Sequence, residues 1–139
     1  MKASSYLNFD GTAEAAFTRY ADVLGGRIEG LFRFGDVPGM AGTGCDPKGV
    51  MHIALSLPGG DMLMASDAPK ERVERVQGFY ISLSLDSVEE VSRIFAALSD
   101  GGAVEMPVQE TFWSEAFSMF TDRWGTPWML SGPDKPMGA

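Results

Sequence analysis

The segment SYLNFDGTAEAAFTRYADVLGG, residues 5–26, predicts a short strand followed by an amphipathic helix. Apolar side chains recur at helical spacing through its second half, and Gly25 and Gly26 supply a stop after the last of them. Glu14 lies in the first turn, where a carboxylate suits the positive end of the helix dipole. The apolar stripe consists of Ala13, Ala16, Phe17, Tyr20, Ala21 and Leu24.

The same plan returns in FYISLSLDSVEEVSRIFAALSDGG, residues 79–102. Ser87 and Glu90 form a capping-box pattern before a second apolar stripe, and Gly101 and Gly102 end it. Three more strand-like runs follow each helix, at 27–34, 50–57 and 61–66 after the first and at 103–109, 115–121 and 126–131 after the second. The predicted order is therefore β-α-β-β-β, twice, which indicates an internal duplication.

The strands alternate between an apolar face and a face of small or polar residues. In VMHIALSL, residues 50–57, Ile53 and Leu55 point one way, and His52 and Ala54 point the other. Position by position, Tyr6 in the first half corresponds to Tyr80 in the second. Met64 corresponds in the same way to Met129.

The length of 139 residues suits one compact domain of two modules, predicted at 1–68 and 76–139, with a polar stretch around Pro69 between them. The connection from Gly35 to Gly49 is rich in glycine and proline, and it is long for a strand-to-strand loop. This connection is either a lid or partner contact, or a flexible loop tip without a function of its own. Cys45 lies within it, and a single cysteine excludes an internal disulfide.

The composition limits the partners and the compartment. The formal net charge is −8, from 11 Lys and Arg against 19 Asp and Glu, so the surface repels phosphate backbones and anionic lipid. No apolar run is long enough to span a bilayer, and the first residues lack the apolar stretch of a signal peptide. We therefore expect a soluble cytoplasmic protein with no nucleic-acid or membrane partner.

Three segments carry a resemblance to a known family: YLNFDGTAEAAFTRYADVLGG (6–26), GGDMLMASDA (59–68) and QETFWSEAFSMFTDRWGTPWM (109–129). They resemble the PhnB-like branch of the vicinal oxygen chelate superfamily, which includes glyoxalase I, bleomycin-resistance proteins and extradiol dioxygenases. The resemblance implies an α+β fold. It also implies a single glyoxalase-like domain over 1–139, with two tandem βαβββ modules whose curved sheets surround a cavity. Proteins of this kind are usually homodimers.

The resemblance also bears on metal binding. Metal-using relatives place four His or Glu ligands on the first and last strand of each module. Mapped by turn and parity, those positions are Tyr6, Met64, Tyr80 and Met129. None of these is an ordinary ligand for a hard divalent cation, so we predict no metal and no cofactor, with a divalent metal as the alternative.

These four residues either fill the cavity as core or line a pocket for an aromatic or flexible apolar ligand. Trp113, with Phe112, is expected at a hairpin tip, where large aromatic side chains serve a pocket rim or a subunit contact better than a core. Other apolar residues of this region are expected to be core, namely Phe117, Met119, Phe120 and Trp128.

Three functions remain open at this point. The first is a metal-free binding protein for a small, partly aromatic molecule, contacted by Tyr6, Met64, Tyr80, Trp113 and Met129. The second is a divalent-metal-dependent lyase, isomerase or dioxygenase of the superfamily. The third is a metal-free enzyme with His52 as general base and Glu110 as acid, because histidine is the residue type best suited to proton transfer near neutral pH and the chain has only one.

Overall fold

The computed structural model describes residues 1–39 and 45–136. The chain divides into two compact units, of which the first is Met1–Glu74 and the second begins at Arg75. The division lies inside the polar stretch 66–78. The predicted connection from 35 to 49 lies partly outside the described residues. At its base, the Phe34 N–H donates to the Gly49 carbonyl at 3.0 Å.

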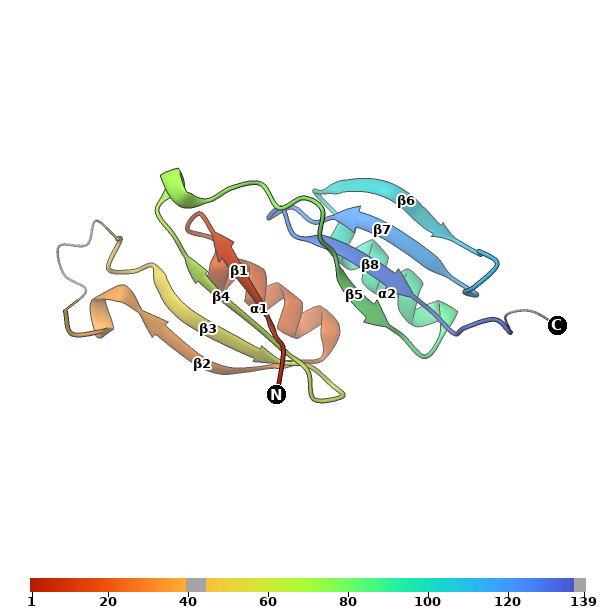
Figure 1. Ribbon diagram of the computed structural model, residues 1–139, viewed down its shortest axis with the longest axis horizontal. Coiled ribbons are helices and arrows are strands. Elements are labelled where there is room, and N and C mark those ends of the chain that lie inside the picture. The colour runs from red at the N-terminus through yellow and green to blue at the C-terminus, as the bar shows by residue number, and fades with distance from the viewer. Residues whose placement is uncertain (40–44, 137–139) are drawn as a thin grey trace. The chain divides into compact units, whose positions relative to one another are not determined.

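The first module contains one helix and one four-stranded sheet (Figure 1). Along the sheet the strands run in the order β1-β4-β3-β2, with β1 parallel to β4 and the other neighbours antiparallel. The elements are β1 (Ser5–Phe9), α1 (Ala13–Leu24), β2 (Arg27–Arg33), β3 (Val50–Ser56) and β4 (Met62–Asp67), with short 3-10 turns at Phe34–Asp36 and Lys70–Arg72.

The second module repeats this arrangement with the strand order β5-β8-β7-β6. Its elements are β5 (Ile81–Ser84), α2 (Val88–Ser99), β6 (Ala103–Gln109), β7 (Phe117–Thr121) and β8 (Pro127–Ser131). The predicted fold class is therefore confirmed: two tandem βαβββ modules form an α+β protein. A cavity enclosed by both sheets stays a prediction.

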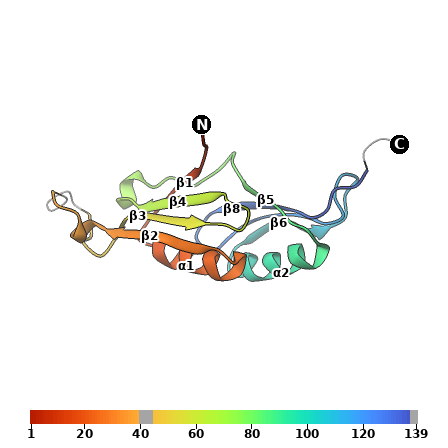
Figure 2. The ribbon, with the colours of Figure 1, turned by 90° about the horizontal axis from the view of Figure 1, so that it is seen from below.

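In each module the helix covers one face of its own sheet (Figure 2). Helix α1 buries its apolar stripe against the sheet, with Phe17 and Tyr20 fully buried. Gly25 ends the helix as predicted, because its φ of 72° is a left-handed conformation that glycine adopts without strain. The face of the sheet under α1 consists of Leu7, Phe9, Ile53, Leu55, Leu63 and Ala65, all buried.

The second module follows the same logic, with one correction to the predicted core. Ser87 caps α2 as predicted, since its hydroxyl accepts the Glu90 N–H at 3.1 Å. Phe120 and Trp128 are fully buried. Met119 was predicted as core, but it is only half-buried. Its parity places it on the face of the sheet opposite α2.

Candidate functional site

The face of the first sheet that points away from α1 carries most of the predicted site residues of this module. The strand register aligns Tyr6 with Met64, and Met64 with Ala54. His52 lies opposite Phe32 on the neighbouring strand β2. We call this surface the aromatic platform, defined by Tyr6, Gly30, Phe32, His52, Ala54 and Met64.

The structure joins Tyr6 to the single histidine of the chain. The Tyr6 Oη lies 3.0 Å from Nδ1 of His52, and the two ring centroids are 5.7 Å apart. Tyr6 is 47% exposed and Phe32 is 53% exposed, which is unusual for aromatic residues inside strands. The platform thus combines two exposed rings with one hydrogen-bonded imidazole.

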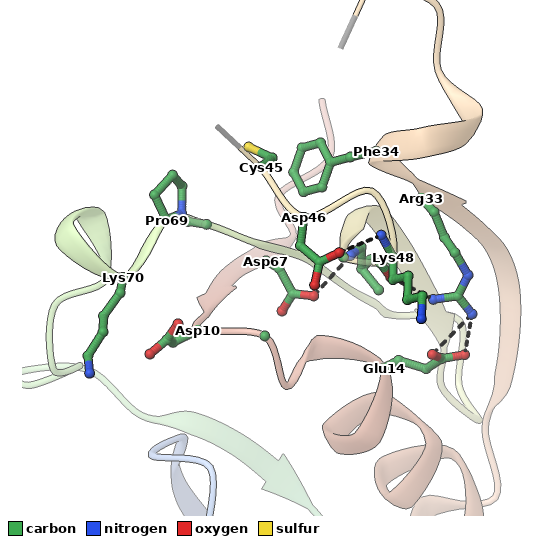
Figure 3. Close-up of a pocket in the computed structure, with 14 residues that line it drawn as sticks. Asp10, Glu14, Arg33, Phe34, Cys45, Asp46, Lys48, Asp67, Pro69 and Lys70 are labelled. Carbon is green, nitrogen blue, oxygen red and sulfur yellow. Dashed lines mark hydrogen bonds and ion pairs between the residues drawn. The ribbon is translucent and has the colours of Figure 1, made fainter. Parts of the chain in front are cut away.

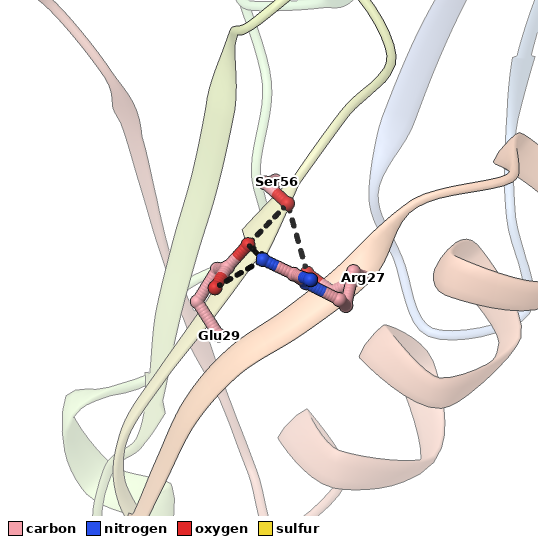
Figure 4. A network of polar contacts seen from close by, with 3 residues as sticks. All are labelled: Arg27, Glu29 and Ser56. Atoms are coloured by element: carbon pink, nitrogen blue, oxygen red, sulfur yellow. Dashed lines mark hydrogen bonds and ion pairs between the residues drawn. The ribbon is translucent and has the colours of Figure 1, made fainter.

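The end of strands β2 and β3 near Ser56 carries a polar network (Figure 4). The Ser56 hydroxyl donates to Glu29 Oε1 at 2.8 Å, and the Arg27 guanidinium donates to both Glu29 oxygens at 2.9 and 3.2 Å. The Ser56 hydroxyl and then Arg27 hold the pKa of the Glu29 carboxyl below its ordinary value. Glu29 is therefore anionic at neutral pH, and its charge is balanced locally.

The second sheet presents a different open face. Met129 pairs with Ser82 on β5 and with Met119 on β7, so Tyr80 is not its direct neighbour across the strands. In the register, Ser82 therefore takes the place in the second module that Tyr6 has in the first, and Tyr80 lies two residues before it. Tyr80 lies just before β5, on the same side of the chain as Ser82.

Tyr80 also has a titratable partner. Its hydroxyl donates to Glu105 Oε2 at 2.6 Å, from the opposite edge strand β6. This hydrogen bond, with partial desolvation and the negative charge of Glu105, raises the pKa of the Tyr80 phenol. Each module therefore bonds a tyrosine hydroxyl to a base carried by another strand.

Trp113 and Glu110 lie in the loop between β6 and β7. Trp113 is half-buried and packs edge-to-face against Phe112 at 4.8 Å and Phe117 at 5.3 Å between ring centroids. Phe112 is 73% exposed, and a role for it at a pocket rim or subunit contact stays a prediction. Glu110 forms an ion pair with Lys135 at 3.1 Å. His52 and Glu110 belong to different modules and have different partners, so their action as base and acid stays a prediction.

A polar cavity of about 380 Å³ lies elsewhere in the first module, at the ends of β1 and β4 (Figure 3). Arg33 forms an ion pair with Glu14 at 2.9 Å, and Glu14 raises the pKa of the guanidinium. Asp67 accepts two backbone N–H groups. The charges around the cavity are nearly balanced, so they favour no class of ligand. The lining has three basic side chains, Arg33, Lys48 and Lys70, and four acidic ones, Asp10, Glu14, Asp46 and Asp67.

Residues 4–130 match the family described as the Glyoxalase/Bleomycin resistance protein/Dioxygenase superfamily. The chain belongs to this superfamily. Protein YjdN of Escherichia coli strain K12 is 32% identical over 140 residues, which cover 94% of this chain and 95% of YjdN.

Two solved structures are similar to the chain over nearly its whole length. The crystal structure of protein PA1353 from Pseudomonas aeruginosa is 41% identical, has a TM-score of 0.86 and covers 95% of this chain and 97% of its own. The PhnB protein from Bacillus cereus is 26% identical with a TM-score of 0.75, covering 96% of this chain and 100% of its own. The predicted membership of the PhnB-like branch is confirmed.

The positions mapped from the resemblance do not suit a hard divalent ion. Within residues 1–39 and 45–136, no group of three or more His, Cys, Asp and Glu side chains could hold a metal ion. By register, the places that correspond between the modules are Tyr6 and Met64 in the first and Ser82 and Met129 in the second. A phenol, a hydroxyl and two thioethers are poor ligands for a hard cation. In the same described part of the chain, no helix is long and apolar enough to cross a membrane.

Proposed function

We propose that this protein binds a small, partly aromatic molecule, without a metal ion, on the aromatic platform of its first module. The observation that carries the proposal is the pair of exposed rings, Tyr6 and Phe32, on either side of a hydrogen-bonded His52. Exposed aromatic side chains gathered on one surface are typical of binding sites.

The neighbouring residues suit such a ligand. Met64 lies beside Tyr6 in the register and offers a flexible, polarizable side chain that adapts to an apolar surface. Gly30 and Ala54 pair across β2 and β3, and Gly30 places no side chain beside the Phe32 ring. Separately from the platform, we propose Tyr80, Met129 and Trp113 as ligand contacts of the second module.

Calorimetric titration with indole, phenol and benzoate, used as simple aromatic test compounds, examines the proposal. We expect Phe32→Ala to weaken binding by about 1 kcal/mol or more, because it removes an exposed ring from the platform. Phe79→Ala is the matched control, since Phe79 is 46% exposed but lies outside the platform. If neither variant differs from the parent protein, or if both lose affinity equally, the platform is not the site.

Trp113 is tested separately by its fluorescence. We expect ligand to quench the tryptophan emission and Trp113→Ala to weaken binding by about 1 kcal/mol or more. Unchanged affinity in this variant would remove Trp113 from the proposed set.

The metal-dependent alternative has its own test. Elemental analysis of protein purified without chelator is expected to find no stoichiometric Ni, Zn, Fe or Mn. A stoichiometric metal would favour the divalent-metal-dependent lyase, isomerase or dioxygenase and overturn the metal-free proposal.

We also propose that the protein is a cytoplasmic homodimer without a nucleic-acid partner. The net charge of −8 disfavours binding to nucleic acid, and the dimer rests on the resemblance to the superfamily. Sedimentation velocity is expected to give twice the chain mass of 15.0 kDa. A single species of chain mass at micromolar concentration would contradict the dimer.

A further inference from the structure

We infer that the ligand of the aromatic platform is an aromatic carboxylate, whose anionic oxygen accepts the Nε2–H of His52 while its ring lies against Phe32. This inference rests on the proposed function and adds the chemical class of the ligand. It follows from the hydrogen bond at Nδ1 of His52, from the Nε2 atom of the same ring and from the surface around Gly30 beside it.

The bond to Tyr6 determines where His52 carries its proton. A neutral imidazole has one donor and one acceptor nitrogen, and the hydrogen bond at one nitrogen selects the state of the other. A phenol hydroxyl is a better donor than its oxygen is an acceptor. The 3.0 Å contact is therefore best made by the Tyr6 O–H donating to Nδ1, which leaves the hydrogen on Nε2. Protonated His52 also carries a hydrogen on Nε2.

The Nε2–H donor has no partner within residues 1–39 and 45–136. The acid that shares this face, Glu29, already accepts from Ser56 and Arg27. A ligand that meets this donor must supply an acceptor. A carboxylate makes the stronger, charge-assisted bond, whereas a neutral carbonyl makes a weaker one.

The surface beside His52 includes a position without a side chain, Gly30. Gly30 pairs with Ala54 in the strand register, and Phe32 pairs with His52 directly alongside. A Cβ built on Gly30 would meet the Phe32 ring at Cε2, 3.7 Å away, so the glycine leaves the edge of that ring uncovered. A ring resting on Gly30 would contact Phe32 while its carboxylate reaches His52.

Nuclear magnetic resonance of the imidazole tests this directly, because the chain has a single histidine and its ring signals need no assignment by mutation. The ring ¹⁵N shifts of the free protein are expected to show hydrogen on Nε2. Tyr6→Phe is expected to move those shifts toward a mixture of tautomers, because it removes the donor to Nδ1.

Titration with sodium benzoate should move the His52 ring signals to saturation. Benzamide, which has the same ring but a neutral acceptor, is expected to bind roughly fivefold to tenfold more weakly, because it lacks the charge-assisted bond. Cyclohexanecarboxylate keeps the charge but loses the flat ring, and it should also bind more weakly. Gly30→Ala should lower benzoate affinity about fivefold or more and leave the ligand-free His52 spectrum unchanged.

The outcomes separate this inference from the proposed function. If benzamide and benzoate bind equally, or if the free protein carries hydrogen on Nδ1, the carboxylate inference is wrong while aromatic binding stands. If benzoate, benzamide, phenol and indole all leave the His52 signals unmoved, both the inference and the proposed platform are wrong.

Discussion

Replacing Asp67 is expected to destabilise the first module more than any exposed acid would. Asp67 ends strand β4 and is only 8% exposed. Its Oδ1 accepts the Ala13 N–H and its Oδ2 accepts the Val50 N–H, each at 2.9 Å. Thr12 precedes helix α1 but makes no side-chain capping bond, so Asp67 supplies the cap from a distant strand.

The size of the effect follows from these two bonds. Ala13 and Val50 are both buried, and an unpaired buried N–H costs about 1–3 kcal/mol. Asp67→Asn keeps one acceptor oxygen, loses the other and removes a negative charge beside the helix N-terminus, which adds about 0.3–1 kcal/mol. We expect a loss of about 1–4 kcal/mol for Asp67→Asn and roughly 2–7 kcal/mol for Asp67→Ala.

Urea unfolding followed by far-ultraviolet circular dichroism measures the loss, and amide hydrogen exchange at Ala13 and Val50 locates it. The control is Asp10→Asn, because Asp10 lines the same cavity but is exposed, and its side chain bonds no group in the described part of the chain. It should change stability by less than about 0.5 kcal/mol. A loss for Asp67→Asn no larger than the control's would refute the reasoning.

Three further results are expected. Gly102→Ala should cost about 1–3 kcal/mol in thermal melts, because its Cβ would collide with the Thr121 carbonyl oxygen; an unchanged melt would contradict this contact. Glu105→Gln should lower the raised pKa of Tyr80 in a tyrosinate absorbance titration. Because the pKa of Tyr80 is higher in the folded protein than in the unfolded one, the hydrogen bond stabilises the fold below about pH 10, and this stability is lost as the pH rises through the folded pKa. An unchanged Tyr80 titration in the Glu105→Gln variant would argue against the bond. Dialysis against a chelator should leave benzoate affinity unchanged, and a loss would indicate a bound metal.

The fold was predictable because burial imposes its periodicity on the sequence. All eight predicted strands and both predicted helices are present in the part of the chain that the structure describes. The helix ends were readable because Gly25 takes a positive φ and Ser87 caps with its own side chain. Both signals are local, so they need no knowledge of the tertiary structure.

The site was less predictable, because its residues depend on register. Phe32 was missed as a site residue since strand β2 has irregularities between Ile28 and Gly30 and again after Phe32. A bulge breaks the alternation that predicts which face of the sheet each side chain occupies. Glu105 was missed as a partner of Tyr80 for the same reason, because it lies at an irregularity in β6 and bonds across the whole sheet.

Asp67 shows that a charged residue lining a cavity can have a structural role. Its segment, SDAP, reads as a polar boundary, and the bonds to Ala13 and Val50 span 54 and 17 residues of sequence. No local pattern predicts such pairs. Asp67 lines the polar cavity, yet both of its oxygens are used to begin α1 and β3, so a structural role accounts for it.

The two faces of the first sheet explain how one fold can change its chemistry. The face under α1 must stay apolar, since Leu7, Ile53 and Leu63 are buried there. The opposite face carries Tyr6 and Met64 one residue away from those core positions, and nothing in the packing under α1 depends on them. Substitution at these positions can therefore change the surface chemistry of the sheet at little cost in stability. The same separation makes the platform testable, because variants there should alter binding and leave the fold intact.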